Sequence, residues 1–216
     1  MFMVHIVILD YAKLTSVFFM YDAVNLLRKR YENIDKRLGG INNYKVIRSG
    51  TIKELQRIYV VYTDVDEAVH TFNKIFGWPM FLSLVETTEM VLFFLAMWVE
   101  NAVPLVSDKP LPVQGLGVIF TSVVFLRLCG PIMIIFSCDA VLQGANKVLR
   151  NCRLLQATVP FLPREMEELK RLENLMENKM PKFTAANFFQ INRSTLLAII
   201  STTTTYMIVI LQFNFY

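Results

Sequence analysis

The sequence predicts an all-α membrane protein with about four transmembrane helices and further helices in the cytoplasm. Three observations support this fold class: 54% of the 216 residues are hydrophobic, only 19% are charged, and the mean hydropathy is +0.42. An average soluble domain is about one-quarter charged. A single soluble core of this size does not need so much apolar material, which argues against an ordinary soluble enzyme. The composition also excludes a disordered chain and a disulfide-built secreted domain.

Three segments are long and apolar enough to cross a membrane, which takes about 20 predominantly apolar residues. They are residues 79–99, 116–138 and 194–213, and the last contains no charge. Residues 1–27 form a weaker fourth candidate, because they include four ionisable side chains, among them Asp10 and Lys13. These two are three positions apart and would pair on one face of a helix. The alternative for residues 1–27 is a buried or interfacial amphipathic helix.

The basic residues predict how these spans are oriented. Residues 28–57 and residues 139–193 each contain nine Lys or Arg, whereas residues 100–115 contain one, Lys109. Basic residues accumulate in cytoplasmic connections. We therefore expect, in chain order, a cytoplasmic loop and helix over 28–78, an extracellular loop over 100–115, cytoplasmic anchor helices over 139–193 and an extracellular tail over 214–216.

Two cytoplasmic segments have the periodicity of amphipathic helices. In Thr51–Phe76 the apolar residues recur at intervals of three and four, and this helix runs into the span at Pro79 as one long element. Pro163–Met180 is a second such helix, which Pro181 ends. Gly39-Gly-Ile-Asn-Asn43 marks a loop. We expect the two helices to pack on each other as a soluble collar; the alternative is a peptide-binding surface.

No catalytic constellation accompanies the predicted spans. The sequence has no nucleophile motif, no zinc or haem spacing and no phosphate-binding glycine loop. Glu86 and Glu89 stand at helical spacing, but no Glu-x-x-His partner completes a carboxylate metal site. We therefore expect no enzyme, no metal, no cofactor and no nucleic-acid partner.

Charged residues inside spans are costly and need an explanation. Arg127 lies near the middle of its span, and Glu86 and Glu89 lie in the middle third of the preceding one. Adjacent antiparallel spans would bring Arg127 against one of the two carboxylates. The contact is either a structural ion pair that fixes the helix register, or a polar wall of a ligand cavity or a gating contact.

The last span has an unusual row of polar residues. Ser201, Thr205, Ile208 and Gln212 fall on one helical stripe of a charge-free segment. Small hydroxyls in such a helix suit the wall of a water-filled pore. They equally suit close helix packing, because Ser and Thr let backbones approach. The chemistry alone leaves both interpretations open.

The last span also contains a motif. Thr205-Tyr206-Met-Ile-Val-Ile-Leu-Gln212-Phe213 resembles the Thr-Tyr, five hydrophobics, Gln-Phe signature in the last helix of the insect gustatory receptor family. Other family-like patterns follow the same order along the whole chain: Asn73-Lys-Ile-Phe-Gly77, Cys138 followed by Ala145-Asn-Lys147, Phe183–Phe189 and Ile191–Leu197. Asn187 departs from the pattern, because the family often has Gly there.

The resemblance implies a seven-span receptor with its amino terminus inside and its carboxyl terminus outside, in agreement with the Lys and Arg counts. Members of the family resemble tetrameric, ligand-gated cation channels, in which four copies of the last helix line the pore and cytoplasmic helices anchor the subunits. On this chain, Gln212 would offer its amide to cations at the outer constriction, and Phe213 would form a hydrophobic gate. Thr205 and Tyr206 would lie lower on the same helix.

The family chain is roughly twice as long, so the four spans correspond to its fourth to seventh. We therefore expect a carboxyl-terminal fragment that lacks the first three spans and responds poorly or not at all to ligand alone. Phe94, Trp98 and Phe120 are candidates for a tastant pocket; the alternative is ordinary core aromatics.

The expected function is a gustatory receptor, a taste-ligand-gated cation channel subunit of the plasma membrane. Its expected partners are a small-molecule tastant, membrane lipid, permeating cations and further subunits of a homo- or hetero-tetramer. The alternatives are an odorant receptor of the same superfamily and a four-span membrane adaptor without a pore.

Overall fold

Five α-helices make up almost all of the part of the chain that the structure describes. The computed structural model describes residues 2–43, 50–102 and 113–215. The elements are, in chain order, α1 (Phe2–Asn43), α2 (Thr51–Ala102), α3 (Val113–Thr158), α4 (Pro163–Asn178), β1 (Thr184–Ala185), β2 (Phe189–Gln190) and α5 (Arg193–Phe215). The all-α prediction is confirmed, with one addition that the sequence did not predict: two very short antiparallel strands, β1 and β2.

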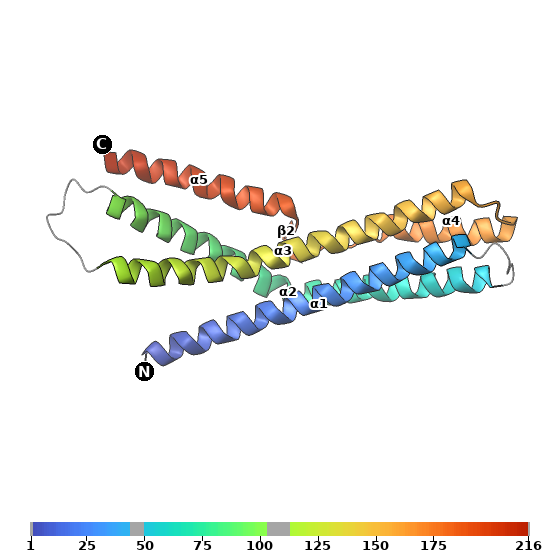
Figure 1. The fold of residues 1–216 in the computed structure, drawn as a ribbon, viewed down its shortest axis with the longest axis horizontal. Helices are drawn as coiled ribbons and strands as arrows, with labels where there is room; N and C mark the ends of the chain where they lie inside the picture. The colour runs from blue at the N-terminus through green and yellow to red at the C-terminus, as the bar shows by residue number, and fades with distance from the viewer. Residues whose placement is uncertain (1, 44–49, 103–112, 216) are drawn as a thin grey trace.

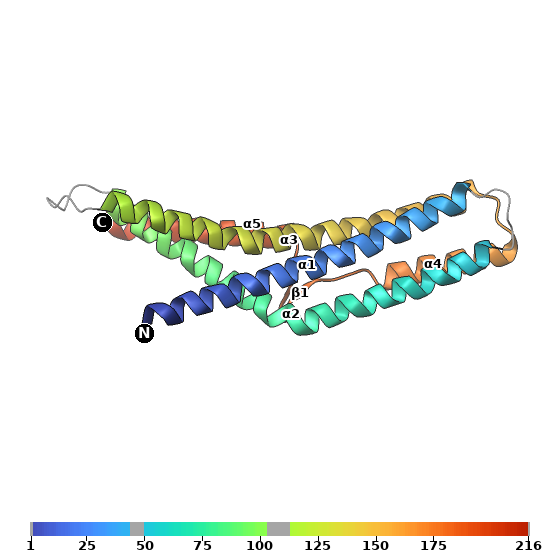
Figure 2. The ribbon, with the colours of Figure 1, turned by 60° about the horizontal axis from the view of Figure 1, so that its bottom comes forward.

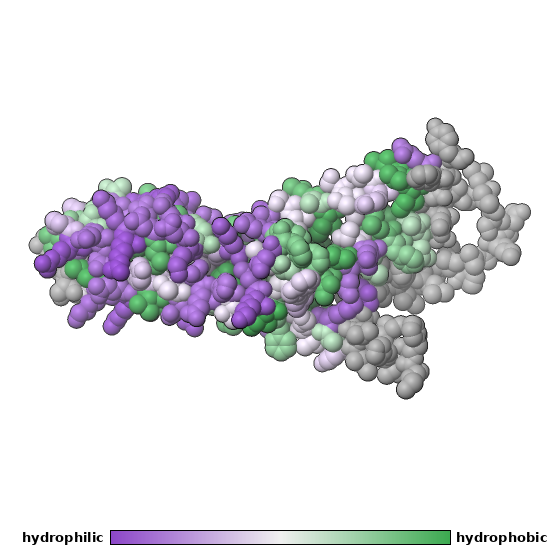
Figure 3. All heavy atoms as spheres, turned by 180° about the vertical axis from the view of Figure 1, so that it is seen from behind, coloured by the Kyte–Doolittle hydropathy of each residue, from purple (hydrophilic) through white to green (hydrophobic). Residues whose placement is uncertain are grey.

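The molecule is elongated, and its two ends differ in character. Helices α1, α2 and α3 run along most of its length, with α4 beside them at one end and α5 at the other (Figures 1 and 2). Hydrophilic side chains gather over the end that contains α4, and hydrophobic ones become more frequent toward the middle of the molecule (Figure 3). We call the polar end, where α4 packs on α2 and α3, the anchor. Its cytoplasmic location stays a prediction.

Helix α2 is the long element that the sequence predicts. It is continuous from Thr51 to Ala102 and has Pro79 in its interior. A proline inside a helix removes a backbone hydrogen bond and bends the helix, and α2 changes direction near its middle (Figure 2). Among the described residues, helices α2, α3 and α5 contain segments long and apolar enough to cross a membrane. Helix α1 is not among them, so the fourth span over 1–27 stays a prediction.

Two loop predictions need correction. Helix α1 continues beyond Arg28 to Asn43, so the loop marked by Gly39-Gly-Ile-Asn-Asn43 is wrong. The buried residues Tyr31, Ile34 and Leu38 extend the apolar stripe of α1 into this segment, and packing outweighs the low helix propensity of Gly and Asn. Helices α2 and α3 also reach into the predicted extracellular loop 100–115, of which residues 103–112 lie outside the described chain.

Helix α4 packs on α2 and α3 through the predicted apolar stripe. Leu169, Leu172 and Met176 are each at most 1% exposed. Beside them the Tyr62 hydroxyl donates to the Lys179 carbonyl oxygen at 3.1 Å. The Tyr31 ring meets that of Tyr62 edge-on, with centroids 5.8 Å apart. The amphipathic helices predicted over 51–76 and 163–180 thus pack on each other as expected, while their cytoplasmic location stays a prediction.

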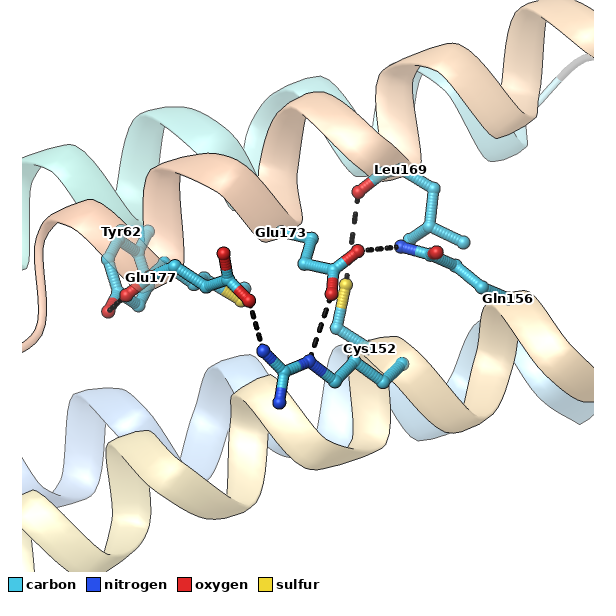
Figure 4. A network of polar contacts seen from close by, with 8 residues as sticks. Tyr62, Cys152, Gln156, Leu169, Glu173 and Glu177 are labelled. Carbon is cyan, nitrogen blue, oxygen red and sulfur yellow. Dashed lines mark hydrogen bonds and ion pairs between the residues drawn. The ribbon is translucent and has the colours of Figure 1, made fainter.

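Polar contacts fix the register of α4 against α3. Glu173 accepts hydrogen bonds from Gln156 at 2.7 Å and from Arg153 at 2.9 Å, and Arg153 also pairs with Glu177 (Figure 4). Ion pairs that involve an exposed side chain such as Arg153 add little net stability, because water and salt screen them. The contacts therefore orient α4, while the apolar stripe supplies most of its stabilisation.

A tight hairpin connects α4 to α5. Ala186 and Asn187 have φ angles of 48° and 62°, and the Phe188 N–H donates to the Ala185 carbonyl at 2.9 Å. Two successive residues with positive φ define a type I′ turn, the usual turn of short hairpins. Asn enters the left-handed region more easily than most residues. Asn187 therefore preserves the turn at a position where the resemblance has Gly.

The hairpin is bound to α2 by Asn73 and Gly77. The Asn73 amide donates to the Lys182 carbonyl at 2.6 Å and accepts from the Thr184 N–H at 3.0 Å. The Ala186 N–H donates to the Gly77 carbonyl at 2.9 Å, and a Cβ on Gly77 would lie 3.1 Å from that nitrogen. Glycine at position 77 permits this close backbone approach.

Helix α5 begins directly after the hairpin. The Asn192 side chain accepts from the Ser194 N–H at 3.0 Å, and Thr195 Oγ1 accepts from the Asn192 N–H at 3.3 Å, which together form a reciprocal cap. Arg193 pairs with Asp139 of α3, with Nε and Oδ2 2.6 Å apart. We call residues 182–195 the joint, because they attach α5 to α2 and α3.

We predict that Leu172→Ala lowers the free energy of unfolding by about 2–5 kcal/mol, because it leaves a cavity in the anchor. Leu154→Ala, at a side chain 53% exposed, should change it by less than about 0.5 kcal/mol. Thermal melting of the purified chain in detergent measures both. Equal losses for the two variants would contradict the packing of α4 described above.

We predict that Gly77→Val destabilises the protein by about 1–3 kcal/mol, because the side chain would have to displace the hairpin backbone. Gly39→Val is the matched control, since a Cβ there meets nothing within 4 Å; its effect should stay within about 0.5 kcal/mol. The same melting experiment compares them. If Gly77→Val proves as mild as its control, the hairpin does not depend on this contact.

Candidate functional site

The predicted polar stripe lies on the outward face of α5. Ser201, Thr205 and Gln212 are exposed, whereas Thr195 and Thr203, on the other side of the helix, are only 8% and 7% exposed. The helix meets α2 and α3 through this second side. The polar stripe is therefore available to water, lipid or another subunit.

Three threonine hydroxyls of α5 donate their protons within the helix itself. Thr203, Thr204 and Thr205 donate to carbonyl oxygens one turn earlier, at Ile199, Ile200 and Ser201, over 2.8–2.9 Å. Each hydroxyl proton is thus used internally, which lowers the cost of placing the group in an apolar setting. A hydroxyl that donates its only proton still offers oxygen lone pairs, and those of Thr205 lie on the exposed face.

A groove of about 480 Å³ separates the membrane half of α2 from α5. Phe81, Leu84 and Ile199 contribute to its mainly apolar lining, and Glu89 is its one carboxylate among the described residues. Of the six residues predicted for a ligand pocket, only Glu89 is in the lining described for this groove. The six predicted residues thus do not line one described cavity together, and the ligand pocket stays a prediction.

Glu86 has a partner that the sequence did not indicate. Its carboxylate pairs with the Lys13 ammonium of α1 at 2.8 Å, and both side chains are 46% exposed. Lys13 was expected to face Asp10, whose side chain lies outside the described part. A pair of opposite charges lowers the cost of both in a membrane. The contact therefore ties α1 to α2 within the apolar half.

The remaining predicted site residues are placed only in part. Phe94 of α2 and Arg127 of α3 are half-buried. Trp98, Phe120 and Phe213 belong to α2, α3 and α5, but their side chains lie outside the described residues. The proposed contact of Arg127 with a carboxylate stays a prediction. Within the described residues no cluster of His, Cys, Asp or Glu could hold a metal ion.

Sequence reasoning missed an aromatic cluster at the joint. Phe81 and Phe188 have ring centroids 5.2 Å apart, and Trp78 meets Phe188 at 6.0 Å. Trp78 and Phe188 are 58% and 66% exposed. Exposed aromatic rings concentrate where a membrane meets water. The signal in the sequence was the position of Trp78 and Phe188 beside the starts of predicted spans.

An ion pair between Lys179 and Asp66 lies just before the joint, on the side of the anchor. Lys179 Nζ and Asp66 Oδ2 are 2.9 Å apart. The hydrogen bond to Asp66 raises the pKa of the Lys179 ammonium, so this lysine keeps its charge at neutral pH. Deeper in the anchor, burial raises the pKa of the Tyr31 hydroxyl, which therefore stays neutral.

Comparisons with known proteins agree with this architecture. A sequence model of the family described as 7tm chemosensory receptor matches residues 3–216. A Drosophila melanogaster protein named "Putative gustatory receptor 28b" is 22% identical over 200 residues, which cover 89% of this chain and 40% of that protein. The chain thus spans less than half the length of this curated relative. Because the family match extends over nearly the whole chain, the protein belongs to the 7tm chemosensory receptor family.

Proposed function

We propose that the chain is a subunit of a gustatory receptor that works as a taste-ligand-gated cation channel, with α5 lining the pore. The observation that carries the proposal is the exposed stripe of Ser201, Thr205 and Gln212 on a charge-free helix. The gustatory assignment is supported by the name of the Drosophila relative and by family membership.

The exposure of α5 supports a role in assembly. Most side chains of α5 between Arg193 and Gln212 are exposed or half-buried, and few are buried within this chain. Ile200 and Val209 lie to either side of the polar stripe and are 59% and 39% exposed. A pore helix needs both surfaces: apolar flanks that pack on neighbouring subunits or lipid, and a polar face turned to water. Four copies around a central axis provide this arrangement.

The chemistry of the stripe supports cations as the permeating species. The Thr205 proton is donated to the Ser201 carbonyl, so the hydroxyl oxygen is left as an acceptor. The side-chain carbonyl of Gln212 is a second acceptor. Oxygen dipoles of this kind replace part of the hydration shell of a cation without the cost of a fixed charge in the membrane.

The joint supports a route from ligand to pore. In the predicted orientation the joint is cytoplasmic, and α5 runs from it toward the outer side. Any movement of α2 in response to a tastant would reach α5 through the backbone contact of Gly77 with Ala186 and through the α2–α5 groove. In this proposal the tastant binds on the outward-opening side of the receptor and not at the joint.

We predict that Gln212→Glu increases the permeability of the channel to Ca²⁺ relative to Na⁺, because a ring of carboxylates favours divalent cations. Reversal potentials in whole-cell recordings measure the ratio. Gln56→Glu, the same change at an exposed position of the anchor, should leave it unaltered. A permeability ratio that Gln212→Glu leaves unchanged, at confirmed surface expression, would contradict the pore assignment.

We predict that Phe213→Ala raises the basal current, because it removes a large apolar side chain from the outer end of α5. Phe125→Ala on α3, where the side chain is 67% exposed, serves as the control and should leave basal current unchanged. Both are compared with the unmodified chain at equal surface amounts. Equal basal currents in all three proteins would contradict the assignment of Phe213 to the gate.

A further inference from the structure

A polar pocket of about 400 Å³ lies on the anchor side of the joint. One wall is α2, with His70, Asn73 and Lys74, and the other is the segment after α4, with Lys179, Lys182 and Asn187. This volume is within the range of small-ligand pockets, about 300–1,000 Å³. It is also distinct from the groove between α2 and α5.

The pocket contains more positive charge than the protein itself neutralises. Lys179 pairs with Asp66 at 2.9 Å. Lys74 and Lys182 are exposed, and within the described chain neither ammonium has an ion pair or hydrogen bond. The pocket thus combines three lysines with one carboxylate that is already engaged. This surplus of positive charge would favour the binding of an anion.

The walls of the pocket are held in place before any ligand binds. The Asn73 side chain is fixed by hydrogen bonds to the Lys182 carbonyl and the Thr184 N–H. Asn187 Oδ1 accepts from the Thr184 hydroxyl at 3.1 Å, which leaves the Asn187 amide N–H groups as donors. A preorganised set of donors lowers the cost of binding.

The pocket lies next to the predicted surface of the membrane. Asn73 and Lys74 precede Pro79, where the predicted span begins, by less than two helical turns. The exposed rings of Trp78 and Phe188 belong to the same region. Aromatic rings mark the level of the lipid headgroups, and basic pockets at this level on the cytoplasmic side bind phosphorylated headgroups.

A second basic groove lacks these properties. Arg37, Lys53 and Arg57 line it near the far end of the anchor. Both arginines pair with Glu54, at 3.1 and 3.5 Å, so among the described residues Lys53 is the one basic side chain of this groove without an ion pair. The groove is also far along the chain from the predicted spans, so it is not expected to lie at the level of the lipid headgroups.

We propose that the pocket beside the joint binds a phosphate-bearing inositol headgroup, that of a phosphoinositide in the inner leaflet. Lys74 and Lys182 hold the phosphates, and His70 and the Asn187 amide add donors. The bound group contacts both α2 and the segment that leads into α5, so it strengthens the joint. The inference goes beyond the proposed channel function. Lipid binding is measured without recording a current, so it can be tested even if the chain is not a channel.

The test uses the full chain purified in detergent and titrated with short-chain phosphatidylinositol bisphosphate, followed by native mass spectrometry. We expect Lys74→Gln together with Lys182→Gln to weaken binding about tenfold or more, because each lysine near a headgroup contributes substantially. Lys36→Gln with Lys170→Gln removes the same charge from exposed anchor positions and should change binding by less than about twofold. Lys74→Arg with Lys182→Arg should retain binding.

Two further ligands identify the source of the headgroup. Phosphatidylinositol without added phosphates should bind far more weakly than the bisphosphate. If soluble inositol trisphosphate binds as tightly as the lipid, the headgroup alone is enough for binding. If only the lipid binds, the ligand comes from the membrane. Either result supports the site. Equal binding of the plain and phosphorylated lipids would overturn the proposal, as would unchanged binding by the Lys74 and Lys182 glutamine variant.

Discussion

The position of α5 depends on one backbone contact, the approach of the hairpin to α2 at Gly77. The Ala186 N–H reaches the Gly77 carbonyl at 2.9 Å, and a Cβ at position 77 would lie only 3.1 Å from the Ala186 nitrogen, so glycine favours this close approach. Asn73 fixes the strand before the turn, and the pair of Arg193 with Asp139 fixes the start of α5. The outward part of α5 is far less constrained, so its stripe stays exposed.

The second constraint is the continuity of the helices between the two halves of the molecule. Helix α2 passes from the polar anchor into the apolar half without a break, and Pro79 bends it where the two meet. The buried stripe of α4 and the paired rings of Tyr31 and Tyr62 make the anchor a packed unit. In the proposed channel such an anchor would hold subunits together, and the basic pocket lies where the anchor meets the apolar half.

Long apolar segments made the membrane-crossing helices predictable from the sequence, and regular periodicity made the continuity of α2 and the buried face of α4 predictable. The hairpin was not predictable, because strands of two residues have no period, and only Asn187 hinted at a turn. The loop expected at Gly39 proved helical, since the buried stripe through Tyr31 and Leu38 outweighs local propensity. The pair of Lys13 with Glu86 joins residues 73 positions apart and depends on the packing of α1 on α2.

The central claim is that the exposed stripe of α5 faces the same stripe of other copies. Cysteine cross-linking in intact membranes tests it directly, with Cys129, Cys138 and Cys152 first replaced by Ala. Thr205→Cys, on the exposed face, should give covalent dimers under mild oxidation, whereas Thr203→Cys, at a side chain 7% exposed, should not. Cross-linking through position 203 but not 205 would contradict the account, because the buried side of α5 would then be the one that meets its neighbours.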